Sequence, residues 1–337
     1  MHTSLSMRDR KQRWLTVGLC SVTVLLFLLS LSSGPVYLSP GKILALVLQG
    51  HDEPLRIVLF EIRLPRALLA ALVGATLGLS GAALQGLLLN PLAEPGVIGI
   101  SGCAALGAVI VFYSGLGAFG IWLLPLGGMT GAFLAVVLLY GLAGRRGRTQ
   151  TLILAGIAIN SIAAALTSLA LNLAESPFAA YDIFFWLMGS LADRSIEHVL
   201  LVLPFTLLGW VLLLSTSASL DALSLGEDTA RSLGVSLLRV RRRMIIGTAL
   251  AVGSAVSVCG MIGFVGLLVP HILRPLCGHR PGALLPASAL GGAGLTLAAD
   301  LATRVPLGAG ELKLGVVTAL VGAPFFIHLV LQQRNAS

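Results

Sequence analysis

Charged residues are scarce in this chain, and their scarcity excludes a soluble globular domain. Asp, Glu, Lys and Arg make up 11% of its 337 residues, whereas 56% of the residues are hydrophobic. The mean hydropathy is +0.96. Because a soluble domain carries about 25% charged residues, the composition indicates a polytopic membrane protein.

The signatures of catalysis and metal binding are also missing. The four cysteines are scattered through apolar segments, so we predict neither a disulfide framework nor a metal site. No Gly-x-x-x-x-Gly-Lys-Ser/Thr phosphate loop occurs, so energy from ATP would have to come from another chain. We therefore expect no enzyme activity, no catalytic residue and no cofactor.

The formal net charge of +8 does not call for a nucleic-acid partner. Cytoplasmic loops of membrane proteins collect Lys and Arg, which accounts for the excess. The basic N-terminus is followed by an apolar run, 14–31, that is long enough to span a bilayer and has no A-x-A cleavage site after it. We interpret this run as a first transmembrane helix in contact with lipid, rather than a signal peptide.

The apolar runs predict an all-α fold of about ten transmembrane helices. A crossing needs about 20 apolar residues, and the run at 263–277 is the shortest, with Pro270 inside it. The predicted spans are 14–33, 63–87, 95–113, 119–142, 150–172, 198–215, 242–261, 263–277, 283–303 and 310–331.

We predict that these spans form a single transmembrane domain over 1–337. Its expected parts are a cytoplasmic N-terminus (1–13), six helices (14–215), a cytoplasmic loop (216–241) and four helices (242–331). Of the 22 Lys and Arg, fifteen fall on the side of both termini and seven on the other side. The positive-inside rule therefore places both termini in the cytoplasm.

A weak internal repeat supports this topology. The spacing of three small or kinking residues recurs 179 residues downstream, where Gly74, Gly81 and Pro91 are matched by Gly253, Gly260 and Pro270. By the predicted topology the first copy runs inward and the second outward. Inverted repeats of this kind are typical of transporters, whose pathway lies at the repeat interface.

Three arginines oppose the charge trend, because Arg63, Arg66 and Arg304 are predicted at the outer side. They could snorkel to lipid headgroups, and Arg304 could pair with Asp300 one turn earlier. Alternatively, they could form a positive outer rim that accepts acidic groups from a partner or an anionic cargo. Charge alone does not choose between these interpretations.

The loop 216–241 contains one candidate helix. In SLDALSLGEDTARSLGVS (219–236), Ser224 resembles an N-cap, Glu227 and Asp228 would lie in the first turn, and Gly234 would end the helix. The basic run Arg239–Arg243 follows. This segment could be a solvated connector with a membrane-surface clamp, or a docking helix for a cytoplasmic partner.

Few polar residues are available to line a path through the membrane. Candidates are Gln85 on the second span and Asn160 and Ser161 on the fifth, although such side chains also bond neighbouring helices. An ion-coupled secondary carrier usually buries ionisable groups at mid-span. Their scarcity here weakens that interpretation.

Motifs spread over nearly the whole chain resemble the FecCD-type permease subunits of binding-protein-dependent ABC importers for iron-siderophores, haem and cobalamin. The matching segments are 63–66 (RLPR), 90–96 (NPLAEPG), 154–157 (LAGI), 186–191 (WLMGSL), 225–234 (LGEDTARSLG), 263–271 (GFVGLLVPH), 299–304 (ADLATR) and 322–326 (GAPFF).

The resemblance implies a homodimeric permease of the cell inner membrane, with two cytoplasmic ATP-binding subunits and a periplasmic substrate-binding protein. It assigns binding-protein docking to Arg63, Arg66 and Arg304. It assigns a cytoplasmic gate to Asn90, Leu92, Thr149 and Gln150. The positions that match the family's coupling helix, within 224–236, are Ser224, Leu225, Gly226, Glu227, Ala230, Leu233 and Gly234.

The cargo implied by the resemblance is large. We expect an iron chelate, either a ferric siderophore or haem, with cobalamin as the alternative. An ion-coupled secondary carrier is the alternative from another class of protein.

Overall fold

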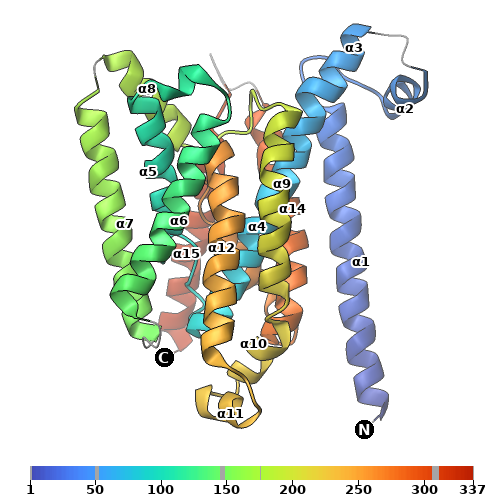
Figure 1. The fold of residues 1–337 in the computed structure, drawn as a ribbon. Helices are drawn as coiled ribbons and strands as arrows, with labels where there is room; N and C mark the ends of the chain where they lie inside the picture. The colour runs from blue at the N-terminus through green and yellow to red at the C-terminus, as the bar shows by residue number, and fades with distance from the viewer. Residues whose placement is uncertain (1, 50–52, 145–148, 175, 306–310, 337) are drawn as a thin grey trace.

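The computed structural model describes residues 2–49, 53–144, 149–174, 176–305 and 311–336. Within these ranges the chain is a bundle of helices without strands (Figure 1). The helices are α1 (His2–Ser32), α2 (Pro40–Gln49), α3 (Glu53–Ile57), the π-helical η1 (Val58–Arg63), α4 (Leu64–Leu88), α5 (Ile100–Tyr113), the 3₁₀ helix η2 (Leu116–Phe119), α6 (Leu123–Ala143), α7 (Thr149–Asn172), α8 (Pro177–Leu187), α9 (Ile196–Leu214), α10 (Ser217–Leu223), α11 (Glu227–Ser232), α12 (Leu237–Cys259), α13 (Val265–Leu273), α14 (Pro281–Thr303) and α15 (Leu314–Ala336).

The prediction of about ten membrane helices is confirmed. Among the described residues, seven helical segments are long and apolar enough to cross a bilayer, and α5 and α15 add shorter apolar helices. The short predicted span 263–277 contains α13, which is nine residues long. Each of the ten predicted spans thus overlaps one helix of the bundle.

Three helices form the centre of the bundle. The most apolar window is 83% buried in the segment containing α4, 78% in α12 and 61% in α14, against 17% in α1 and 28% in α7. Figure 1 shows α4, α12 and α14 inside, with α1 and α7 at opposite margins. In a bilayer, exposed apolar side chains on the marginal helices meet lipid, so burial measures contact between helices rather than polarity.

Small residues allow the central helices to touch. A Cβ atom built on Gly78 of α4 would lie 2.0 Å from the carbonyl oxygen of Ser288 on α14, and one built on Gly81 would lie 1.8 Å from that of Gly266 on α13. A Cβ on Gly131 of α6 would lie 2.0 Å from the carbonyl oxygen of Cys103 on α5. Backbone at this distance leaves no room for any side chain, as in small-residue contacts of other membrane bundles.

The two ends of the bundle differ. Both termini lie at the end that carries α10 and α11, and α2, α3 and α8 lie at the opposite end (Figure 1). An even number of crossings produces this arrangement. We call the end with α11 the inner end and the end with α8 the outer end.

Several elements differ from the spans expected from hydropathy. The second predicted span, 63–87, is the lower part of a continuous helical segment, Glu53–Leu88. The helix α8 lies in a stretch where no span was predicted, and α12 begins at Leu237, so the basic run Arg239–Arg243 is helical. Hydropathy locates only the part of a helix that lies in lipid, which explains why these extensions were missed.

Candidate docking, gating and coupling sites

Arg63 is buried at the outer end of α4, where it holds the end of α1. Its side chain donates to the carbonyl oxygens of Leu31 at 2.8 Å and Ser32 at 2.9 Å, and also to that of Val36. The last carbonyls of a helix lack partners within the helix and carry partial negative charge. Arg63, which is 4% exposed, therefore fastens the end of α1 to α4.

Arg66 and Arg304 share a buried carboxylate. Asp300, which is 1% exposed, accepts from Nε of Arg66 at 2.8 Å and from Nη2 of Arg304 at 2.6 Å. Arg66 also reaches Glu311 at 2.9 Å and the hydroxyl of Thr303 at 3.1 Å. The ion pair between Arg304 and Asp300, which the sequence left open as one interpretation, is present.

The structure thus brings the three outer arginines into one cluster around the end of α1 and Asp300. Arg304 completes it by donating to the carbonyl oxygens of Ser30 at 2.7 Å and Ser33 at 3.1 Å. These contacts are internal, so a docking role for the cluster stays a prediction. Arg63 would have to release three carbonyl groups before it could contact a partner.

The end of α8, the end of α12 and the start of α15 meet at a junction of non-helical backbone. The N–H of Ser190, after α8, donates to the carbonyl of Cys259 at the end of α12 at 2.8 Å. The N–H groups of Leu314 and Gly315, at the start of α15, donate to the carbonyls of Gly189 at 2.9 Å and Met188 at 3.1 Å. Non-helical backbone inside a membrane protein is tolerated where protein covers it or where it lines a cavity.

Glycine is required at this junction. Gly189 and Gly260 have φ angles of +76° and +74°, which glycine adopts at no steric cost. A Cβ on Gly260 would lie 2.2 Å from the carbonyl oxygen of Trp186, and one on Gly315 would lie 2.3 Å from that of Met188. The three chain segments therefore approach at backbone distance.

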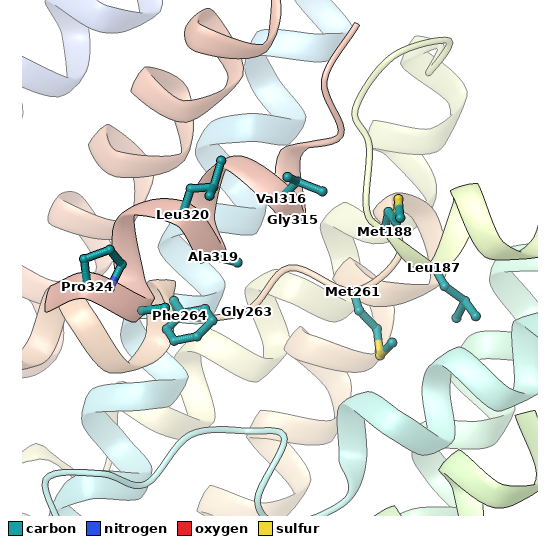
Figure 2. A pocket seen from close by; sticks show the side chains of 11 residues that line it. Leu187, Met188, Met261, Gly263, Phe264, Gly315, Val316, Ala319, Leu320 and Pro324 are labelled. Carbon is teal, nitrogen blue, oxygen red and sulfur yellow. The ribbon is translucent and has the colours of Figure 1, made fainter. Parts of the chain in front are cut away.

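A cavity of about 650 Å³ opens beside this junction. Figure 2 shows side chains of α15, including Val316 and Ala319, on one side and Met188 and Met261 on the junction segments. The lining consists of Leu187, Met188, Met261, Gly263, Phe264, Gly315, Val316, Ala319, Leu320, Ala323 and Pro324. No lining side chain is charged, so this open pocket presents an apolar surface without strong polar anchors.

The predicted gate residues after α4 form a tight turn at the inner half of the bundle. Leu89 ends α4 with a left-handed φ of 48°, and the Asn90 side chain accepts from the N–H of Leu92 at 2.9 Å. Leu92 is 44% exposed. Glu94, in the same turn, accepts from the backbone N–H of Phe264, and burial raises the pKa of its carboxyl. The turn thus touches the segment that lines the cavity.

The predicted pathway residues lie elsewhere. Gln85 is 1% exposed and accepts from Nη2 of Arg274 at 2.5 Å, between α4 and the end of α13. Asn160 is half-buried and faces Gly102 of α5, whose added Cβ would lie 2.3 Å from the Asn160 side-chain oxygen, and Ser161 is exposed on α7. The lining of the described cavity includes none of the three.

The cavity is instead lined in part by residues of the family-like motifs, for which no pathway role was predicted. The motifs at 186–191, 263–271 and 322–326 each supply lining residues. The signal at 263–271 and 322–326 was glycine together with proline inside an apolar run, and at 186–191 it was a single glycine. Two of these segments, 186–191 and 263–271, include the non-helical residues next to α8 and α13, whereas 322–326 lies within the continuous helix α15. Only the tertiary structure brings the three together.

The predicted short helix of the inner loop is α11, outside the bundle at its inner end (Figure 1). Gly234, with φ of +83°, ends it: the N–H of Gly234 donates to the carbonyl of Arg231 and that of Val235 to Ala230. The predicted N-cap role of Ser224 is wrong. Ser224 is the C-cap of the preceding helix α10, and its hydroxyl donates to the carbonyl oxygen of Asp221 at 2.7 Å. The residue directly before α11 is Gly226, with φ of +102°.

The surface of α11 is partly apolar. Leu225 and Leu233 flank it and are 65% and 63% exposed, whereas Ala230 within it is buried. The predicted gate residues Thr149 and Gln150 start α7 nearby, with Gln150 exposed and the Thr149 hydroxyl 3.3 Å from Arg241 of α12.

Known proteins match this chain over nearly its whole length. The model of the FecCD transport family matches residues 22–332. The chain is 40% identical over 330 residues to the vitamin B12 import system permease protein BtuC of Klebsiella pneumoniae, covering 97% of this chain and 96% of that protein.

Two further relatives extend the similarity. The uncharacterized ABC transporter permease protein YvrB of Bacillus subtilis is 41% identical over 292 residues, which cover 85% of this chain and 82% of that protein. A solved structure of an ABC transporter assigned to the metal-chelate type, in an inward-facing conformation, superposes with a TM-score of 0.85 at 34% identity. The superposition covers 95% of this chain and 99% of the chain in that solved structure.

Proposed function

The chain belongs to the FecCD transport family and is the permease subunit of an ABC importer, and from this premise we propose that it moves a large metal chelate through the membrane without performing chemistry itself. Hydrolysis of ATP belongs to separate subunits in this family. The proposed cargo is a corrinoid of the cobalamin type, with an iron chelate as the second candidate.

The observation that carries the proposal of a corrinoid is the similarity to BtuC, which extends over 97% of the chain. The second candidate, a ferric siderophore or haem, is favoured by the similarity to the transporter of metal-chelate type. Both kinds of cargo are bulky and partly apolar. An uncharged cavity at a junction of broken helices suits their passage, because it offers surface without anchoring them.

The protein is a multi-pass protein of the inner membrane. We place the inner end, with both termini and α11, in the cytoplasm because the excess of Lys and Arg falls on that side. The proposed partners are two ATP-binding subunits at the inner end, a periplasmic binding protein at the outer end, and a second copy of this chain across the pathway.

The proposed docking face for the binding protein is the outer arginine cluster. Three arginines against Asp300 and Glu311 leave an excess of one positive charge there. Glu311 is 51% exposed, so it is the carboxylate that an acidic group of the partner could replace on Arg66. In this proposal Arg66 and Arg304 receive the partner, and Arg63 holds α1 in place beside them.

The proposed surface for the ATP-binding subunits is α11 with its flanking residues. Leu225 and Leu233 supply exposed apolar area at the inner end, which a groove on a soluble partner could bury. The proposed gate consists of the turn with Asn90 and Leu92 and the start of α7 with Thr149 and Gln150. Its support is that both segments lie in the inner half of the bundle.

The decisive experiment is uptake by the reconstituted complex. The permease, its ATP-binding subunits and binding protein would be placed in proteoliposomes and supplied with labelled cobalamin, a ferric siderophore or haem. We expect ATP-dependent uptake of cobalamin. Uptake of an iron chelate alone would select the second candidate, and ATP-independent uptake driven by an ion gradient would refute the assignment.

A further inference from the structure

Arg241 differs from the other arginines of the basic run in where its side chain lies. The run Arg239–Arg243 lies in the first two turns of the long helix α12. Besides Arg241 it contains three exposed arginines, Arg239, Arg242 and Arg243. The side chain of Arg241 is 14% exposed. A guanidinium with so little access to water needs protein acceptors in place of it.

Those acceptors lie on two other helices. Through one nitrogen, Nη2, Arg241 donates to Oε1 of Glu227 at 2.9 Å and to the hydroxyl of Thr149 at 3.3 Å. Glu227 is the first residue of α11, and Thr149 is the first residue of α7. One side chain of α12 therefore joins the starts of α11 and α7.

A glycine flanks the helix α11 on each side. Gly226 and Gly234 flank it with φ angles of +102° and +83°, and a Cβ on either glycine would meet no atom within 4 Å. The second oxygen of Glu227 holds Arg231, one turn along α11, at 3.4 Å. The Glu227 carboxylate thus contacts both Arg231 of α11 and Arg241 of α12.

The helix α7 is the less buried partner of this link. It runs along the margin of the bundle (Figure 1), and 28% of its most apolar window is buried, against 78% for α12. A helix with few internal contacts is displaced at a lower free-energy cost than a packed one. A change at its first residue would therefore displace α7 at a lower free-energy cost than α12.

We propose that Arg241 is a positioning residue that transmits movement of α11 to the inner end of α7. This inference rests on the proposed function, in which the ATP-binding subunit moves α11. Displacement of α11 withdraws the Glu227 carboxylate from Arg241, and the guanidinium loses the charged acceptor that orients it. Its hold on Thr149 then changes, which releases or resets the start of α7.

The test compares cargo transport with ATP hydrolysis in the complete reconstituted complex. In Arg241→Met the apolar stem stays and the hydrogen bonds to Glu227 and Thr149 disappear. The ATP-binding subunits should still co-purify and hydrolyse ATP. The amount of labelled chelate transported per ATP should fall by about tenfold, the factor expected when a charge-assisted hydrogen bond is lost. The matched control is Arg243→Met, an exposed arginine of the same run.

Two further variants separate transmission from a purely structural role. Thr149→Val leaves α11 and Arg241 paired and should lower transport per ATP as Arg241→Met does. The exchanged pair Glu227→Arg with Arg241→Glu should recover coupling, because the new glutamate can accept from both the new arginine and the Thr149 hydroxyl.

The proposal is overturned if Arg241→Met transports as much chelate per ATP as the control. It is also overturned if Thr149→Val transports as much chelate per ATP as the control and the exchanged pair transports no more than Arg241→Met. The loss in Arg241→Met would then come from instability alone. A wild-type complex that transports no chelate would instead refute the proposed function.

Discussion

The buried carboxylate of Asp300 offers the sharpest test of how the outer end is built. In Asp300→Asn the side chain keeps its shape, but a neutral amide replaces an anion that lies 2.8 Å from Arg66 and 2.6 Å from Arg304. The amide oxygen can serve one guanidinium, and its NH₂ group then faces the N–H groups of the other. Arg304, whose side chain is 9% exposed, is then left without a carboxylate among the described residues, whereas Arg66 keeps Glu311.

The expected loss of stability is large. Breaking a buried ion pair by removing one partner costs about 3–5 kcal/mol, because the remaining charge is uncompensated. The contrast is Glu311, which also contacts Arg66 but is 51% exposed. For Glu311→Gln we expect at most about 1 kcal/mol, the range of exposed ion pairs.

The assay is thermal or SDS-induced unfolding of the detergent-solubilised protein, followed by size-exclusion chromatography and intrinsic fluorescence. Asp300→Asn should unfold well before Glu311→Gln. Adding Arg304→Met to Asp300→Asn should recover part of the loss, because it removes the arginine that is left without a carboxylate. If Asp300→Asn is as stable as Glu311→Gln, the carboxylate does not hold the outer end together and the reasoning fails.

Three further outcomes test the packing, the docking face and the coupling surface. Gly78→Leu should destabilise the protein by about 1–3 kcal/mol or more through overpacking, because its Cβ would lie 2.0 Å from the Ser288 carbonyl oxygen. The control is Gly141→Leu, whose Cβ has no atom within 4 Å. Equal unfolding midpoints of the two variants would contradict this packing. Glu311→Gln should strengthen binding of the periplasmic protein up to about fivefold in an interferometry assay by freeing Arg66 of a competing carboxylate, and weaker binding would exclude Arg66 as the docking group. Leu233→Asp should abolish co-purification of the ATP-binding subunit by placing a charge on the apolar surface of α11, and a complex that still forms would move the contact elsewhere.

Much of the fold follows from sequence because the signals involved are local. An apolar run of the right length becomes a helix in lipid, since backbone groups must be satisfied within the segment. The spacing of Gly74 and Gly78 on one helix face predicts close approach to another helix, and α14 fills that place. Gly234 ends α11 as expected, because its position after the last helical turn is itself a local signal.

The candidate sites depended on contacts that no local pattern contains. Ser224 was assigned to the wrong helix because its neighbours also fit the end of α10. Gln85, a polar residue in an apolar span, is committed to Arg274, which lies 189 residues away. The cavity is lined by apolar residues, so a search for polar side chains could not find it.

The sequence by itself determined the class of the protein, its membrane helices, its small-residue contacts and, through its motifs, its family. These properties depend on composition and on residues within a few turns of each other. Only the tertiary structure decided which charges meet: Arg66 lies 234 residues from Asp300, and Arg241 was one arginine among several in a basic run. Burial distinguishes these arginines from the exposed ones, because a buried charge must lie against a specific partner group, whereas an exposed charge is solvated by water.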